Sequence, residues 1–282
     1  MSDPVLVDQR GGVTIVTLND PATRNALSPD MTQELYAALD DFDANPEAHV
    51  LVLTGADPSF CSGANVRRFD STRDALDAAA PAESLPWGAM EARLGRRNDD
   101  GEAGFGSVSD APLRIYEVQK PTIAAVNGFA IGVGLGLALS CDIRIASDQS
   151  QFSEAFVRMG LIPGDGSTWQ LPRMIGMSNT LLLQYTGDRI DAAEALRMNL
   201  VSKVYPHEEM MGAVMDLAER LASGATYSMS LTKYLVHQSM DLGLSESLRL
   251  AQVAQEQARR SDDHREAVRA FLDKRNPDFK GR

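Results

Sequence analysis

Three short apolar segments place the strongest limit on how this chain can fold. They are Val50–Thr54, Thr122–Val126 and Ile143–Ala146, and apart from Arg144 and the threonines at the ends of the first two they are apolar. A strand with one face in water alternates, whereas a strand of a parallel sheet covered by helices is apolar throughout. The segments therefore predict an α/β fold with a buried, largely parallel sheet, extending from Pro4 to about Val204.

Turn and cap residues punctuate the first part of this region. Gly11-Gly12 stands between Val5–Val7 and Val13–Leu18, which predicts a β-hairpin. Ser28-Pro29 predicts the start of a helix, since serine caps free N–H groups and proline tolerates the first helical position. Asn45-Pro46 predicts its end.

Farther along, Asp191–Glu194 is an aspartate variant of the capping box and predicts a short helix, followed by a strand over Val201–Val204. From about Glu208 the apolar spacing is helical only. We expect an α/β core over residues 1–205 with a long insertion at about 69–113, and a helical C-terminal region over 206–282. The insertion is either a lid or pocket wall, or a plain surface insertion.

The net charge limits the kinds of partner to expect, and the cysteine content indicates the cellular compartment. The 282 residues include 39 acidic and 27 basic ones, a net charge of −12, which speaks against a nucleic-acid or anionic membrane surface as the main partner. Cys61 and Cys141 form no CxxC pair and the four histidines are scattered, so we expect reduced thiols and no metal site. With no signal peptide and no long apolar run, we expect a cytoplasmic protein.

Two glycine-containing turns each follow a buried strand. The first is Ser59–Asn65, and the second is Asn127–Gly136, which feeds an apolar helical stretch. The spacing of Gly132, Gly134 and Gly136 lacks the final step of a dinucleotide fingerprint. Two alternatives remain: close packing of helix on strand, or turns that face each other and each donate one N–H to a polarised carbonyl, forming an oxyanion hole.

At this point the sequence resembles a known family, the enoyl-CoA hydratase/isomerase (crotonase) superfamily. Order and spacing match over nearly the whole chain, and the finer match is to the branch of phenylacetate-pathway ring-opening isomerases. The segments that carry the resemblance are Phe60–Ala64, Lys120–Gly128, Cys141–Ala146, Gly160–Pro163, Tyr185–Asp188 and Phe271–Arg282.

The resemblance implies a crotonase-type spiral of ββα units, with a helical C-terminal region that forms homotrimers or hexamers. It implies acyl-CoA thioester substrates, with coenzyme A as part of the substrate and no separate cofactor. Two backbone N–H groups bind the thioester oxygen and stabilise an enolate, and the matching positions are Ala64 and Val133. A small ligand of this kind needs only a few local donors, so the net charge does not exclude it.

The resemblance also places the coenzyme A site. The matching positions are Arg24, Ala26, Leu27, Ser62, Ala64 and Val66. Arg24 is the first choice for a phosphate contact; the alternative is a solvated surface arginine. The Arg93–Arg97 cluster and the C-terminal Lys280 and Arg282 are further candidates.

The main departure from the family concerns catalysis. Family hydratases use two glutamates, whose positions are taken here by Gly136 and Phe156. Neither residue transfers protons, and loss of a general acid or base costs typically 10²–10⁴-fold. Ordinary hydration is therefore in doubt, and an isomerase or an atypical hydratase is favoured. The alternative is a catalytically silent acyl-CoA-binding homologue.

Substitute carboxylates are sought near the turns. Asp165, in a glycine-lined loop, is the first candidate, against the alternative of an aspartate that only suits a turn. Glu154 lies two residues before Phe156 and on a helix would point away. Asp142 is expected to be structural. Glu91, Glu102 and Glu117 could reach the pocket only if the insertion folds as a lid. Phe156, Trp87 and the insertion favour a bulky apolar or aromatic acyl group.

Overall fold

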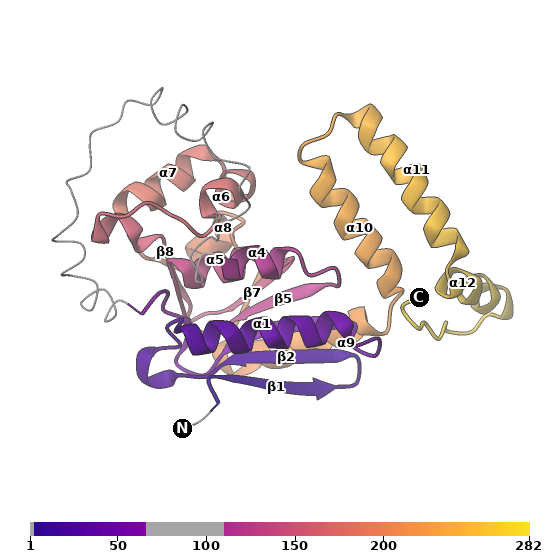
Figure 1. The fold of residues 1–282 in the computed structure, drawn as a ribbon, viewed down its shortest axis with the longest axis horizontal. Coiled ribbons are helices and arrows are strands. Elements are labelled where there is room, and N and C mark those ends of the chain that lie inside the picture. Colours follow the sequence, from indigo (N-terminus) through magenta and orange to yellow (C-terminus); the bar gives the residue numbers. More distant parts are fainter. Residues whose placement is uncertain (1–2, 66–109) are drawn as a thin grey trace, which may run out of the picture.

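A computed structural model describes residues 3–65 and 110–282, and its first layer is a six-stranded sheet in the order β1-β2-β3-β5-β7-β10 (Figure 1). All neighbours except the hairpin pair β1 and β2 run parallel. The strands are β1 (Val5–Arg10), β2 (Val13–Leu18), β3 (Val50–Gly55), β5 (Thr122–Val126), β7 (Ile143–Ser147) and β10 (Lys203–Tyr205). The predicted hairpin and the predicted parallel sheet are confirmed.

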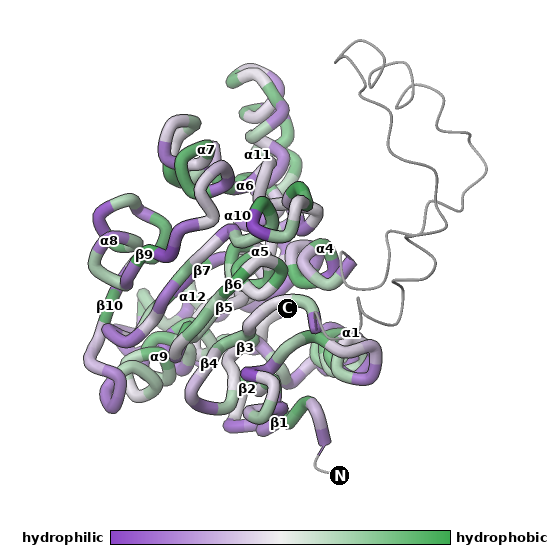
Figure 2. Tube along the Cα trace, turned by 90° about the vertical axis from the view of Figure 1, so that its left-hand side faces the viewer, coloured by the Kyte–Doolittle hydropathy of each residue, from purple (hydrophilic) through white to green (hydrophobic). Residues whose placement is uncertain are grey.

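Apolar residues of the same strands divide between two faces. Leu51 and Leu53 of β3 pack beneath α1 (Pro29–Ala44), α4 (Asp110–Tyr116) and α5 (Val133–Ser140), whereas Val50 and Val52 pack against α9 (His207–Ala222). In Figure 2 the central strands of the sheet and α5 are coloured mostly as hydrophobic. Burial on both faces explains why these strands carry no polar alternation.

Helix α1 begins and ends where the sequence predicts. The Ser28 hydroxyl accepts from Met31 N at 3.1 Å, Pro29 is the first helical residue, and Asn45 follows the last. At the far end, Lys120 Nζ donates to Phe42 O and Asn45 O, both at 2.8 Å. The carbonyls that a helix end leaves free are thus satisfied from the segment before β5.

The second layer is a small sheet in the order β4-β6-β8-β9. Its strands are β4 (Ser59–Cys61), β6 (Phe129–Ile131), β8 (Gln151–Ser153) and β9 (Ile190–Asp191). The first three run parallel, and β9 pairs antiparallel with β8. Around them lie the 3-10 segments η1 (Pro21–Thr23) and η4 (Ala155–Met159), and the helices α6 (Ser167–Ile175), α7 (Met177–Thr186) and α8 (Ala192–Arg197).

The segment from Asp191 to Tyr205 contains a short capped helix and a strand. The Asp191 carboxylate caps α8 by accepting from Glu194 N at 2.8 Å, as predicted. The strand predicted over Val201–Val204 begins two residues later, at Lys203. Leu200 and Val201 are buried in the core before the chain pairs with β7, so their apolar character reflects packing rather than sheet pairing.

The C-terminal part is helical, as predicted. After α9 come α10 (Thr226–Ser239), α11 (Leu244–Arg260) and α12 (Asp262–Asp273). Figure 1 shows α10 and α11 side by side and separated from the main sheet, whereas α9 packs on that sheet. No helix in the described residues is long and apolar enough to cross a membrane.

Candidate active site

Three parallel strands of the small sheet end at the same edge, and the candidate site residues follow directly after them. β4 leads to Ala64, β6 leads to Val133, and β8 leads to Glu154 and Phe156. Because the carboxyl ends of parallel strands meet at the same edge of a sheet, residues far apart in sequence converge there. The predicted convergence of the two glycine turns follows from this pairing.

Glycine is required where the two turns approach. A Cβ on Gly134 would lie 2.2 Å from Cys61 O, and Gly63 has φ +95° with space of only 2.7 Å to Ile131 O. A Cβ on Gly63 would also lie 3.8 Å from Val133 N. Close packing therefore accounts for Gly134, while also bringing the turn before Ala64 beside the start of α5.

Two backbone N–H groups at this edge, those of Ala64 and Val133, are not used by the hydrogen bonds of the neighbouring bridge or helix. Leu27 forms a parallel bridge with Ala64 and donates to Gly63 O at 2.8 Å. In such a bridge Leu27 bonds to residues on either side of Ala64, so the N–H of Ala64 points away from it. Val133 is the first residue of α5, where an N–H has no acceptor within the helix.

Phe156 forms an apolar wall at this turn. Its ring atoms lie 3.6 and 3.7 Å from the position of a Cβ on Gly132, the residue before Val133. The side chain is half-buried on η4. An aromatic ring therefore lies next to the start of α5, where it offers apolar contact and no proton.

Asp165 supplies the carboxylate next to α5. A Cβ on Gly136 would lie 2.7 Å from Asp165 Oδ2 and 3.0 Å from its Cγ. The Asp165 carboxyl group thus occupies the volume that a side chain at position 136 would enter. Within the described residues, Asp165 Oδ2 is buried and has no hydrogen-bond partner.

A second buried carboxyl group is joined to Asp165 through one serine. Ser167 Oγ lies 2.7 Å from Asp165 Oδ1 and 2.9 Å from Glu154 Oε2. The helical conformation on which the expectation for Glu154 depended is not present, because residue 154 has φ −92° and ψ 65° between β8 and η4. Its side chain is fully buried and turns toward Ser167.

Burial sets the charge preference of this pair. Burial, and then the nearby Asp165, raise the pKa of Glu154 well above its ordinary value. Burial also raises the pKa of Asp165, although hydrogen bonds from the Ser167 hydroxyl and N–H oppose that rise. The pair therefore favours holding a proton at pH values where exposed carboxyl groups are ionised, and Glu154 favours it more strongly than Asp165.

The sequence model of the enoyl-CoA hydratase/isomerase family matches residues 8–85 and 89–282 of this chain. The chain belongs to the enoyl-CoA hydratase/isomerase family. It is 32% identical over 281 residues to a short-chain-enoyl-CoA hydratase of Clostridium acetobutylicum, covering 99% of this chain and 98% of that protein. A crotonyl-CoA hydratase of Syntrophomonas wolfei is 32% identical over 98% of this chain and 97% of its own length.

Solved structures agree with this assignment. The crystal structure of an enoyl-CoA hydratase from Bacillus anthracis aligns with a TM-score of 0.83 and 28% identity, covering 99% of this chain and 100% of that one. The α/β crotonase fold expected from the sequence is confirmed. This member of the enoyl-CoA hydratase/isomerase family carries Gly136 and Phe156 where the resemblance places the two glutamates of family hydratases.

The residues expected to hold coenzyme A gather on neighbouring turns. Ser62 Oγ donates to Thr23 O at 2.9 Å and Ser62 N donates to Arg24 O at 3.0 Å, while Ala26 and Leu27 are buried behind them. Val66 lies outside the described residues.

Arg24 is exposed at this place, and its guanidinium carbon lies 5.1 Å from the centre of the Phe129 ring. Arg189 lies 5.4 Å from the same ring. The sequence near Arg189 does not indicate this proximity. It arises because β9, which begins at the next residue, pairs with β8, and β8 pairs with the strand that carries Phe129.

The other charged candidates divide into three groups. Asp142 has a structural role: it accepts from Thr122 N at 2.8 Å and pairs with Lys233 Nζ at 3.0 Å, joining α10 to the main sheet. Lys280 pairs with Asp278, and Arg282 with Asp262. Glu91, Glu102, Trp87 and the arginines 93, 96 and 97 lie outside the described residues.

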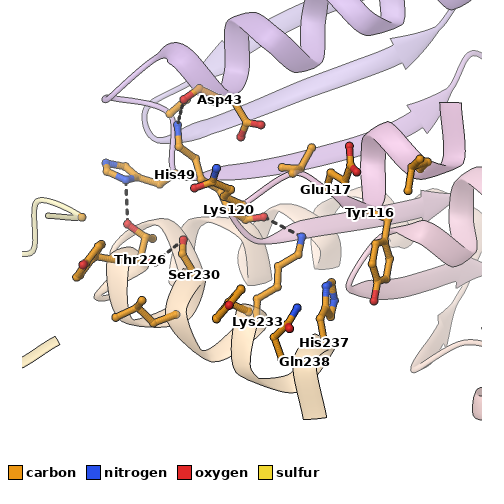
Figure 3. A pocket seen from close by; sticks show the side chains of 18 of the residues that line it. Asp43, His49, Tyr116, Glu117, Lys120, Thr226, Ser230, Lys233, His237 and Gln238 are labelled. Atoms are coloured by element: carbon orange, nitrogen blue, oxygen red, sulfur yellow. Dashed lines mark hydrogen bonds between the residues drawn. The ribbon is translucent and has the colours of Figure 1, made fainter. Parts of the chain in front are cut away.

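A pocket of about 1420 Å³ separates α10 from the core, and the exposed Glu117 lies on its wall (Figure 3). Lys233 reaches from α10 to Lys120 O at 3.3 Å, and Thr226 bonds to His49 at 3.1 Å. Toward the loop of Asp165 the lining is aromatic: Tyr116 stacks on His237 at 4.2 Å and meets Trp169 edge-on at 5.7 Å.

The two cysteines are not candidates for nucleophilic catalysis. Both are free and buried, and burial raises the pKa of each thiol to about 12. A thiol with so high a pKa is not ionised near neutral pH. Among the described residues, no group of three or more histidine, cysteine or acidic side chains could hold a metal ion.

Proposed function

We propose that this chain is an acyl-CoA isomerase that moves a double bond along the acyl group of an enoyl-CoA thioester. The observation that carries the proposal is the Asp165 carboxylate beside Gly136, with one oxygen unpaired. One carboxylate is sufficient for a proton shift, whereas family hydratases use two. The catalytic residues are Ala64, Val133 and Asp165.

The proposed reaction has two proton transfers. The thioester oxygen accepts hydrogen bonds from Ala64 N–H and Val133 N–H, which stabilise the negative charge that develops there. Asp165 Oδ2 takes a proton from the α carbon of a β,γ-unsaturated thioester, and the electron pair of the broken C–H bond delocalises onto the thioester oxygen as a dienolate. Asp165 then returns the same proton to the γ carbon, so no water is consumed.

Phe156 favours isomerisation over hydration. Its ring packs at Gly132, next to the N–H of Val133. Hydration needs a water molecule held and activated beside the substrate by a polar group. An apolar ring at this place favours exclusion of water, which protects a dienolate from side reactions.

Recognition of the coenzyme A moiety would fall to the exposed turns near Phe129. Arg24 and Arg189 supply positive charge there. The other positions that match the coenzyme A site in the resemblance are Ala26, Leu27, Ser62, Ala64 and Val66. Guanidinium groups suit phosphate because they form paired, charge-assisted hydrogen bonds. A few such donors are compatible with a net charge of −12.

The aromatic end of the pocket, whose described lining includes Asp165 but neither Ala64 nor Val133, favours a bulky or aromatic acyl group that extends past Asp165. Tyr116, Trp169 and His237 line it close to the loop that carries Asp165. Large rings present flat apolar surface for a ring or a long chain. Short, unbranched acyl groups would leave that surface uncovered.

The proposal is tested with a panel of enoyl-CoA thioesters that differ in double-bond position and in acyl bulk. Isomerisation is followed by product analysis, and hydration is followed separately by incorporation of labelled oxygen from water. We expect isomerisation without label, fastest with bulky acyl groups. Hydration as the main reaction would contradict the proposal, and tight binding measured by calorimetry with no turnover would establish the silent acyl-CoA-binding alternative.

A further inference from the structure

The contacts of Ser167 restrict how many protons the buried carboxyl pair can hold. Ser167 Oγ lies within hydrogen-bond distance of three groups: Asp165 Oδ1 at 2.7 Å, Glu154 Oε2 at 2.9 Å and Gln184 Nε2 at 3.4 Å. A serine hydroxyl has one hydrogen to donate and two lone pairs to accept with. Because it has a single hydrogen, Ser167 can donate to only one of the two carboxyl groups, and it has one lone pair left after accepting from Gln184.

Two ionised carboxylates would leave one of these contacts without a hydrogen. Both oxygens would then be acceptors facing a hydroxyl that can serve only one, in a place where Ser167 and Glu154 are fully buried. An unpaired buried charge is costly. A single proton on one carboxyl group removes the conflict, because that group donates to Ser167 and Ser167 donates to the other.

The remaining contacts decide which group holds the proton. Asp165 Oδ1 also accepts from Ser167 N at 3.1 Å, a bond that favours an ionised Asp165. Within the described residues, Glu154 Oε1 and Asp165 Oδ2 are both buried without a hydrogen-bond partner. The backbone bond to Asp165 Oδ1 is therefore the contact that distinguishes the two groups, and it leaves the proton on Glu154.

We infer that Glu154 is a neutral carboxylic acid that donates through Ser167 to an ionised Asp165, and thereby acts as the positioning residue for the Asp165 carboxylate. The chain of donors runs from Glu154 Oε2 to Ser167 Oγ to Asp165 Oδ1. It fixes Oδ1 and leaves Oδ2 beside Gly136. The inference deepens the proposed function, and its first test does not depend on turnover.

That test is the infrared spectrum of the wild type at neutral pH. We expect the C=O stretch of a protonated carboxylic acid, lost in Glu154→Gln and retained in Asp165→Asn. Glu209→Gln, at an exposed position, is the matched control and should leave the band in place. Absence of the band in the wild type, or its loss in Asp165→Asn but not in Glu154→Gln, would overturn the inference.

A second test uses the isomerase assay. Glutamine keeps a donor for Ser167, whereas alanine removes it, so kcat should fall roughly tenfold or more in Glu154→Ala. Glu154→Gln should restore most of that loss, with matching thermal denaturation to show that both variants fold. Equal losses in both would show that Glu154 acts as a charged group and overturn the inference. If no variant or wild type turned over, the proposed function would fail while the infrared result stood.

Discussion

The Asp165 side chain fills the space that a side chain at position 136 would need. A Cβ at 136 would lie 2.7 Å from Asp165 Oδ2 and 2.8 Å from Asp165 Cβ. Gly136→Ala should gain about 1 kcal/mol of helix propensity but lose about 1–3 kcal/mol to overpacking.

The sign of this change depends on residue 165. In an Asp165→Gly background the contact is gone, so Gly136→Ala should stabilise the protein. Urea denaturation of the four proteins in this double-mutant cycle measures the coupling. The same effect of Gly136→Ala in both backgrounds would show that the two residues do not compete for space.

Glu154 also gives the stability a pH dependence. Its pKa is raised in the folded protein above the ordinary 4.5, so the unfolded chain releases this proton first as the pH rises. As the pH rises above about 4.5, the free energy of unfolding of the wild type therefore falls relative to that of Glu154→Gln. The limiting slope of this fall is about 1.4 kcal/mol per pH unit. Urea denaturation of both proteins over a pH series should show this widening difference; a constant difference would contradict it.

At the scale of elements, Lys120 joins α1 to the sheet. Its ammonium donates to Phe42 O and Asn45 O and lies 4.8 Å from the centre of the Phe42 ring. Lys120→Ala should lower the free energy of unfolding by about 1–3 kcal/mol, because buried carbonyls lose their donor. The exposed Lys203→Ala is the control, expected within about 0.5 kcal/mol of wild type. Equal effects of both substitutions would contradict this role.

The strands of the main sheet were predictable because their signal is local. Val50–Thr54 is apolar throughout, and Ser28 caps its helix within three residues. The small sheet was not predictable, because β8 and β9 have only three and two residues. Strands so short carry no pattern, and their pairing depends on contacts across the fold.

The same limit applied to the site. Ala64, Val133 and Asp165 could be located from turns and from the family resemblance, whereas the orientation of Glu154 could not. If residue 154 were helical, its side chain would point away from the site. The non-helical backbone after β8 instead brings the Glu154 side chain to Ser167. Arg189 was missed for a related reason, since its position beside Phe129 depends on the short β9 strand.

At the scale of the whole molecule, the C-terminal helices expose large apolar side chains. Leu244 and Phe271 are 77% and 84% exposed, and Leu248, Val253 and Leu272 are exposed as well. Exposed apolar surface of this extent is typical of association sites. We expect homotrimers or hexamers, as the family resemblance implies. Light scattering after gel filtration should give a multiple of three chains, and a monomer at micromolar concentration would contradict this.

The central claim is that Asp165 provides the proton-transfer group that positions 136 and 156 lack. Its most direct test is kcat for the best thioester of the panel in wild type and Asp165→Asn, with Asp188→Asn as an exposed control. We expect kcat to fall by about 10²–10⁴-fold in Asp165→Asn, with the calorimetric Kd for the thioester and the thermal midpoint little changed. Turnover at the wild-type rate in folded Asp165→Asn would contradict it.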